Sequence, residues 1–159
     1  MEGLILLGGI FIVLMFLGLI IGIILYLVQA FGLYGMAQKA GLENAWLAFV
    51  PVANFYLMGK LIKQIKVSKY VIPSAEIVLP VAMVVLLVLG RVAFLGDLIN
   101  LCGYLLFLAG YYYLYLLYRP KDAVMFTALS IPVVTVPFFI FMMRNDPMII
   151  EEQNEAASV

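Results

Sequence analysis

The feature that most constrains this chain is an apolar run of 25 residues, Leu4 to Val28, near its first residue. As an α-helix the run would be about 37 Å long, which exceeds the roughly 30 Å hydrocarbon core of a bilayer. A cleaved signal peptide would begin with basic residues and have a shorter apolar core, whereas this chain begins Met1-Glu2-Gly3. The run therefore predicts a membrane-spanning helix that tilts or projects.

The composition of the whole chain agrees with a membrane protein. Of 159 residues, 67% are hydrophobic and 11% are charged, and the mean hydropathy is +1.17; soluble proteins carry about a quarter charged residues. Nine basic and nine acidic residues cancel, which excludes a nucleic-acid partner. The chain lacks histidine, the usual general base and metal ligand. Cys102 has no second cysteine for an intrachain disulfide.

Three further apolar segments follow the first. We therefore expect an all-α, polytopic membrane protein with four transmembrane helices at about 4–28, 71–89, 98–118 and 123–143. These helices would form one domain over residues 1–147. The short acidic tail, 148–159, is expected to be disordered.

The first helix is expected to continue past the apolar run until Gly41, a residue typical of helix C-termini. Within the run, Gly18 and Gly22 form a small-xxx-small pattern that allows another helix to approach closely. Such a pattern serves packing within one chain or dimerisation, and packing within the chain is the favoured interpretation.

The stretch 45–65 is long enough to span but is interrupted. Asn44 would cap the start of its helix, Pro51 removes a backbone donor midway, and Asn54 would lie near the membrane centre of a full span. A kinked re-entrant or interfacial helix instead keeps all the flanking lysines on one side of the membrane. These lysines are Lys39, Lys60, Lys63, Lys66 and Lys69.

Basic residues in the loops predict the orientation. With four spans, one side holds the five lysines above together with Arg119 and Lys121, whereas the other side holds Arg91 and Arg144. Seven basic residues against two place both termini outside. The prediction is a multi-pass protein of the cell (cytoplasmic) membrane.

Residues 39–56 resemble a family signature. Lys39-Ala40-Gly41 followed by Trp46-x-Ala48-x-x-Pro51-x-x-Asn54-x-Tyr56 is similar to the motif of a family of small polytopic bacterial membrane proteins, some labelled as associated with signal peptidase I. The segment from Ile131-Pro132 to Asp146 resembles the closing helix of that family. Ala45 stands where members usually have glycine. The resemblance implies a helical fold in a bacterial inner membrane and carries over no activity.

Several polar and aromatic residues are candidates for a site. Trp46, Tyr56 and Tyr70 would form a ligand cage or, as favoured here, an interfacial aromatic belt. Asn54 is a ligand group or satisfies backbone freed near Pro51. The lysines expected to attract anionic lipid head groups at the cytoplasmic face, each contributing about 1 kcal/mol, are Lys60, Lys63, Lys66 and Lys69.

Four tyrosines share one face of the third expected span, and their hydroxyl groups need partners inside the membrane. They are Tyr104, Tyr111, Tyr115 and Tyr118. Thr127, Ser130 and Thr135, or Asn54, are the candidate partners. A helix interface is favoured over a polar substrate cavity, because interhelical hydroxyl contacts are common.

Glu76 and Asp97 are carboxylates within or beside apolar spans, where they are costly and often functional. Each stands near the end of its span and can reach head-group water, and the two lie near opposite ends of the second span. They are therefore not expected to form an acid/base pair.

The sequence predicts no catalytic, cofactor or metal site. The favoured function is a non-enzymatic accessory protein that packs against another membrane protein or forms a homo-oligomer. The alternative is a small oligomeric transporter or channel whose pathway is lined by Glu76, Asn54 and the tyrosine face. An intramembrane enzyme comes third.

Overall fold

The computed structural model describes residues 2–63, 65–67, 70–72, 74–91 and 95–149. Over these residues the chain forms six α-helices, one 3-10 helix and a hairpin of two short strands. Their bounds are α1 Glu2–Lys39, η1 Ala45–Phe49, α2 Ala53–Ile62, β1 Ile65–Val67, β2 Tyr70–Ile72, α3 Ala75–Leu89, α4 Gly96–Tyr118, α5 Ala123–Leu129 and α6 Val136–Met143. The expected all-α class is confirmed. The expected disordered tail lies outside the described residues, apart from its first two.

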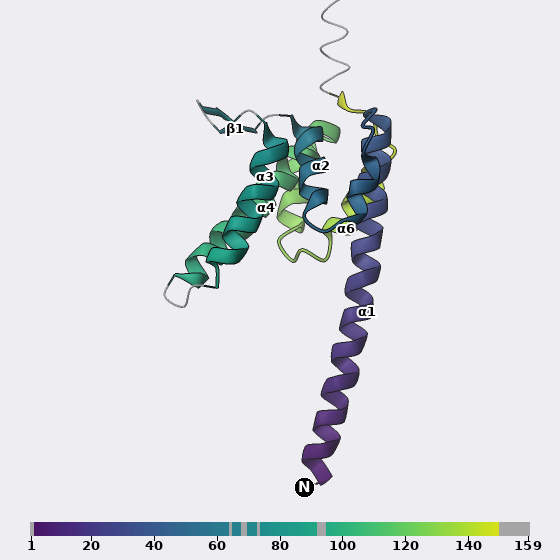
Figure 1. Cartoon of the computed structure of the whole chain (residues 1–159). Coiled ribbons are helices and arrows are strands. Elements are labelled where there is room, and N and C mark those ends of the chain that lie inside the picture. Colours follow the sequence, from purple (N-terminus) through teal and green to yellow (C-terminus); the bar gives the residue numbers. More distant parts are fainter. Residues whose placement is uncertain (1, 64, 68–69, 73, 92–94, 150–159) are drawn as a thin grey trace, which may run out of the picture.

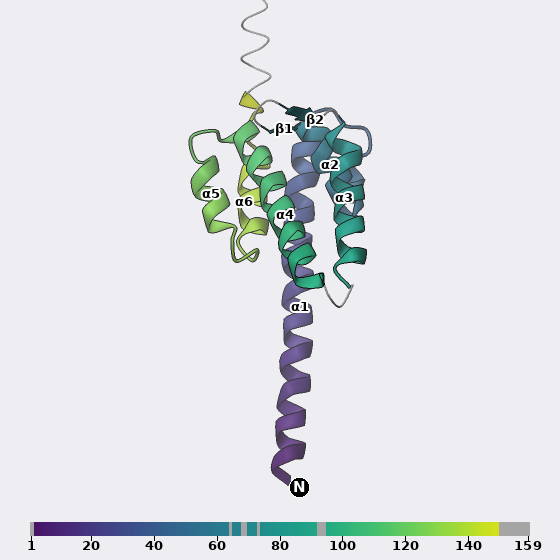
Figure 2. The same ribbon diagram turned by 90° about the vertical axis from the view of Figure 1, so that its left-hand side faces the viewer.

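Figure 1 shows α1 as one long helix that rises from the foot of the molecule to its top. The other helices gather beside the upper part of α1. In Figure 2, α3 descends from the top and α4 climbs back, after which α5 descends and α6 climbs again. The start of α1 and the end of α6 therefore lie at opposite ends of the described structure.

Two described helices are long and apolar enough to cross a bilayer. They are α1, counted from Leu6, and α4. The apolar helix α3 is shorter, at 15 residues. The structure is thus consistent with a membrane protein, but the four transmembrane helices expected from the sequence are not confirmed.

The C-terminus of α1 has a capping structure that the sequence predicts. The amide of Gly41, which has a φ of +70°, donates to the Gln38 carbonyl at 3.0 Å, and the amide of Leu42 donates to the Ala37 carbonyl at 3.0 Å. This is the Schellman arrangement, in which a glycine in the left-handed region turns the chain out of the helix. The expected stop at Gly41 is confirmed.

The segment 45–65 is not one helix. The 3-10 helix η1 descends beside α1, the chain turns at Pro51 and Val52, and α2 climbs back to the top, where the β1–β2 hairpin follows (Figure 1). The break falls at the proline, which cannot donate a helical hydrogen bond. Asn44 occupies the N-cap position of η1, but its side chain makes no capping hydrogen bond. The expected kink and return are therefore present, as two helices.

The expected second and third spans correspond to α3 and α4. α4 agrees with the prediction to within two residues, whereas the first residues of 71–89 form strand β2, which pairs antiparallel with β1 so that Ile65 faces Ile72. Isoleucine and valine on both sides of a short turn favour such a hairpin. The prediction missed it because the same residues also suit an apolar helix.

The fourth expected span, 123–143, is wrong as a single crossing helix. α5 ends at Leu129, the chain turns through residues 130–135, and α6 returns toward the top. Nε of Arg119, before α5, lies 2.5 Å from Oδ2 of Asp146, after α6, so both ends of the segment meet. Pro132 explains the break, because its ring would clash with a helical carbonyl and it has no N–H to donate.

The chain thus contains the same local design twice. α1 and α4 are each followed by a polar turn, a short helix, a Pro-Val turn and a second short helix. In both turns the valine has a positive φ, 70° at Val52 and 56° at Val133. A β-branched residue rarely adopts this conformation, so its occurrence at both turns marks a structural repeat.

Glycines on the two long helices reinforce this repeat. Asn44 and Asp122 each precede the first short helix of their repeat. Gly32 and Gly110 lie at the same distance before them, twelve residues in each case. A Cβ added at Gly32 would lie 2.7 Å from the Phe141 backbone nitrogen in α6, and one added at Gly110 would lie 2.9 Å from the Met58 Cε in α2. Each long helix therefore packs closely against the second short helix of the other repeat.

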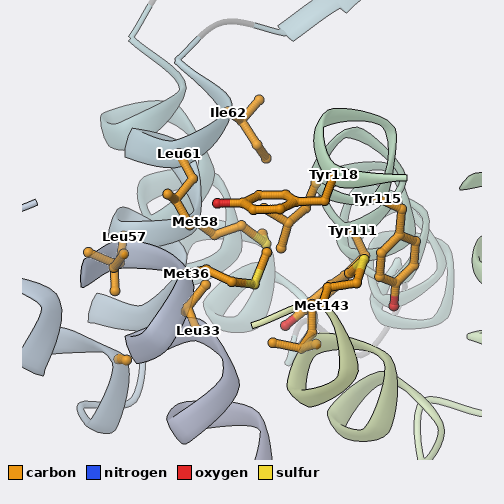
Figure 3. Close-up of a cluster of buried hydrophobic side chains, with 14 of the residues drawn as sticks. Leu33, Met36, Leu57, Met58, Leu61, Ile62, Tyr111, Tyr115, Tyr118 and Met143 are labelled. Carbon is orange, nitrogen blue, oxygen red and sulfur yellow. The ribbon is translucent and has the colours of Figure 1, made fainter. Parts of the chain in front are cut away.

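The hydrophobic core lies where the two repeats meet at the upper end of the bundle. Figure 3 shows side chains from four helices converging there. Leu33 and Met36 come from α1, and Met143 comes from α6; α2 supplies Leu57, Met58, Leu61 and Ile62, and α4 supplies Tyr111, Tyr115 and Tyr118. The two repeats therefore share one core.

Candidate functional site

The N-terminal part of α1, residues 6–27, is here called the lower segment. Sixteen of its large apolar side chains are each at least 41% exposed, whereas Leu25 and Tyr26 near its upper end are half-buried, and the most apolar part of α1 has no buried residue. The bundle leaves this segment free because α1, at about 57 Å, is much longer than α4, at about 35 Å. Figure 1 shows it projecting below the bundle.

The glycine pattern of the lower segment has no partner in the chain. A Cβ added at Gly18 or Gly22 would meet nothing within 4 Å. The interpretation of this pair as a site of packing within the chain is therefore wrong. It is Gly32, one of the glycines outside the pattern, that brings α1 against α6.

The tyrosine face of α4 points into the bundle, as the sequence predicts. Tyr111, Tyr115 and Tyr118 are buried. The Tyr115 hydroxyl lies 2.9 Å from the Ser130 hydroxyl, which itself donates to the Phe126 carbonyl at 2.7 Å. Ser130 was one of the predicted partners, so this contact is confirmed. A helix interface, rather than an open cavity, is what these hydroxyls form.

Two other hydroxyls have partners that the sequence did not predict. Nε2 of Gln29 donates to the Tyr111 hydroxyl at 2.5 Å, which ties α1 to α4. The Tyr104 hydroxyl donates to the carbonyl of Ile131, just before the second Pro-Val turn. Of the other predicted partners, Thr127 and Thr135 bond to carbonyls of their own hairpin. Gln29 could have been found, because a lone amide in an apolar helix needs a partner.

Asn54 lies at the start of α2 and is 8% exposed. Its Oδ1 is buried and has no hydrogen-bond partner among the described residues, and the same holds for the Tyr26 hydroxyl. The sequence suggested that Asn54 could satisfy backbone groups freed near Pro51. Its Oδ1 does not do so in the described structure. A buried unpaired carbonyl oxygen is costly and suits a bound water or another donor.

The aromatic residues of the motif are dispersed. Trp46 on η1 is 59% exposed, and Tyr56 on α2 is half-buried beside the Lys60 ammonium, which stands 5.2 Å from the ring centre. The side chain of Tyr70 lies outside the described part of the chain. Exposed Trp46 suits an interfacial aromatic residue. Pro51 is exposed in the turn between η1 and α2.

The charged groups of the top end interact with one another. Interaction with Tyr56, and more weakly with Glu76 and Glu43, raises the pKa of Lys60. Lys63 is exposed at the end of α2. Lys66 lies in β1, and Lys69 lies outside the described residues. The lipid-binding role of these lysines stays a prediction.

A second group of charges closes the top of the α5–α6 hairpin. The hydrogen bond from Arg119 to Asp146 raises the pKa of the guanidinium group, and the Lys39 ammonium donates to the Asn145 carbonyl at 2.7 Å. An open pocket of about 480 Å³ beside them is lined by Arg119, Lys121, Asp122 and Asp146. Its two cations and two anions offer no net charge to an anionic head group.

Glu76 and Asp97 are far apart. Glu76 lies in the first turn of α3 at the top, and Asp97 lies exposed in the first turn of α4 at the lower end of the bundle. Each carboxylate is favourably placed at a helix N-terminus. Within the described residues, no three His, Cys, Asp or Glu side chains gather in a way that could hold a metal ion.

No family model, curated protein or solved structure matches this chain. The family resemblance of the motif around Trp46 and Asn54 stays a prediction.

Proposed function

We propose that this chain is a non-enzymatic membrane accessory protein that binds another membrane protein through the lower segment of α1. The observation that carries this proposal is that the most apolar part of α1 has no buried residue and that nothing in the described structure lies within 4 Å of a Cβ added at Gly18 or Gly22. Lipid satisfies apolar side chains, but glycine costs about 1 kcal/mol relative to alanine inside a helix. Glycines at this spacing are typical of surfaces where another membrane helix approaches.

The proposed orientation follows from the charges and from the return of both hairpins. The described basic side chains in or beside the elements that meet at the top are Lys39, Lys60, Lys63, Arg119, Lys121 and Arg144, whereas Arg91 follows α3 at the lower end of the bundle. The top would then face the cytoplasm and the start of α1 the opposite side. α1, α3 and α4 would cross, and 45–62 and 123–143 would be re-entrant. At about 22 Å, α3 requires local thinning of the bilayer.

A second candidate is a transport pathway lined by Glu76, Asn54 and the tyrosine face. The unpaired buried oxygen of Asn54 favours it, whereas the hydroxyls of Tyr111 and Tyr115 are already bonded to protein groups. A proton or solute flux in proteoliposomes that disappears in both Glu76→Gln and Asn54→Leu would support a pathway. We expect no such flux, and Glu76→Gln should leave the fold intact.

Photo-crosslinking in the native membrane tests the docking proposal. Benzoylphenylalanine in place of Phe11, in the lower segment, should form adducts with protein. The matched control is Phe138 on α6, another apolar position of similar exposure, where adducts with lipid alone are expected. Lipid adducts alone from Phe11 and from its neighbours in the lower segment would overturn the proposal.

A further inference from the structure

The glycine pair continues the face of α1 that packs inside the bundle. An α-helix turns about 100° per residue, so Gly18, Gly22 and Gln29 lie within about 40° of one another around α1. Gln29 points inward and bonds to Tyr111 of α4. Below the bundle the same face carries the two glycines and is covered by nothing in the chain. The vacant surface is thus continuous with the established interface.

The internal repeat indicates what kind of element belongs there. The lower part of α4 is covered by α3: a Cβ added at Gly103 would lie 3.6 Å from the Leu86 side chain, and the Asn100 amide reaches the Gly90 carbonyl at 3.4 Å. α1 is the corresponding long helix of the first repeat, and the described chain supplies no second helix of this kind. By analogy with α4, the uncovered glycine face of α1 is suited to packing against another helix.

We propose that a second copy of this chain fills that place, so that two α1 helices cross at Gly18 and Gly22 in a parallel homodimer. This inference rests on the proposed docking role of the lower segment. Every copy has the same charge asymmetry between top and foot, so two copies insert with α1 in the same direction. Parallel helices with small residues four apart approach closely, and a two-fold arrangement fills the vacancy of both copies at once.

The glycine face of the lower segment carries exposed apolar side chains that a second copy could contact. Leu7, Phe11 and Met15 share this face and are each at least 64% exposed. Apolar residues from the two glycine-flanking faces would provide most of the contact, with the glycines at the crossing point.

Disulfide crosslinking of two differently tagged copies tests the dimer. In a Cys102→Ser background, Met15→Cys lies on the glycine face and leaves both glycines in place, whereas Ile24→Cys lies on the opposite face. Oxidation in membranes should give a product that carries both tags from Met15→Cys, at least several-fold more than from Ile24→Cys. Adding Gly18→Ile and Gly22→Ile should abolish it. The fold should survive this change, because nothing lies within 4 Å of either position.

The outcomes separate this inference from the proposed function. Equal crosslinking from both faces, or crosslinking that survives Gly18→Ile with Gly22→Ile, would overturn the glycine-centred dimer. Photo-adducts of Phe11 with a different protein, without a product carrying both tags, would overturn the dimer and leave the docking role standing. Adducts with lipid alone would overturn both.

Discussion

The two parts of α1 have similar sequences and opposite surroundings. From Ala30 to Ala37 the helix is packed by α6, η1 and α2, and its side chains form the core with α4. From Leu6 to Ile24 the same continuous helix has no buried residue, and its large apolar side chains in the described structure are exposed. Hydrophobicity alone thus does not decide what a membrane helix packs against. The difference arises from the length of the rest of the bundle, which covers only the upper part of α1.

The largest expected effect concerns the side of the membrane at which α6 ends. Because α6 packs against the upper part of α1, the C-terminal ends of both helices should lie on the same side. In a Cys102→Ser background, Asn145→Cys should react with a membrane-impermeant thiol reagent only after cells are opened. Arg91→Cys should react in intact cells, since it follows α3 at the lower end of the bundle, away from the top. Reaction of Asn145→Cys in intact cells would mean that 123–143 crosses the membrane, and the contrast between the two parts of α1 would lose its basis.

Replacing glycines sharpens the contrast directly. Gly32→Leu should lower the free energy of unfolding by about 3 kcal/mol, because the new side chain would overlap the backbone of Ile140 and Phe141. Gly18→Leu should change it by less than about 0.5 kcal/mol in monomeric protein, since its surroundings are open. Denaturant unfolding in detergent measures both. Equal destabilisation by the two changes would contradict the account.

The polar contact of α1 should have a smaller effect. Gln29→Met removes the donor to Tyr111 and leaves a buried hydroxyl unpaired, which should cost about 1–2 kcal/mol. Adding Tyr111→Phe should restore part of that loss, because no unpaired hydroxyl then remains. The same unfolding assay gives the coupling energy, and strictly additive losses would show that the two side chains do not interact.

Local sequence signals predicted much of the fold. Gly41 marks the end of α1, Pro51 marks the break between η1 and α2, and the apolar run before Tyr118 gives α4 almost to the residue. Each of these depends on residues close together in the chain. Ser130 as a partner of Tyr115 was among the predicted candidates, since a tyrosine hydroxyl inside the membrane needs a polar partner and the next apolar segment supplies hydroxyl groups.

The missed features depend on contacts between distant residues. Residues 123–143 contain prolines, which membrane-spanning helices also tolerate, so the prolines alone did not predict that the segment returns. The contact of Arg119 with Asp146 shows that its two ends meet. The vacancy around Gly18 and Gly22 likewise depends on where α3 and α4 lie relative to α1. Spacing identifies a surface suited to close approach, but it does not say whether the chain itself fills that surface.

The most direct test of the docking account is an oxygen-accessibility scan of spin labels along the lower segment in bilayers. Single cysteines at Leu7, Phe11 and Met15 lie on the glycine face and leave the glycines unchanged, whereas Ile20 and Ile24 lie on the opposite face. We predict low access of oxygen to the first three labels and high access to the other two, repeating with the helical period. Uniformly high access around the helix would mean that lipid alone surrounds the segment, and it would contradict the account.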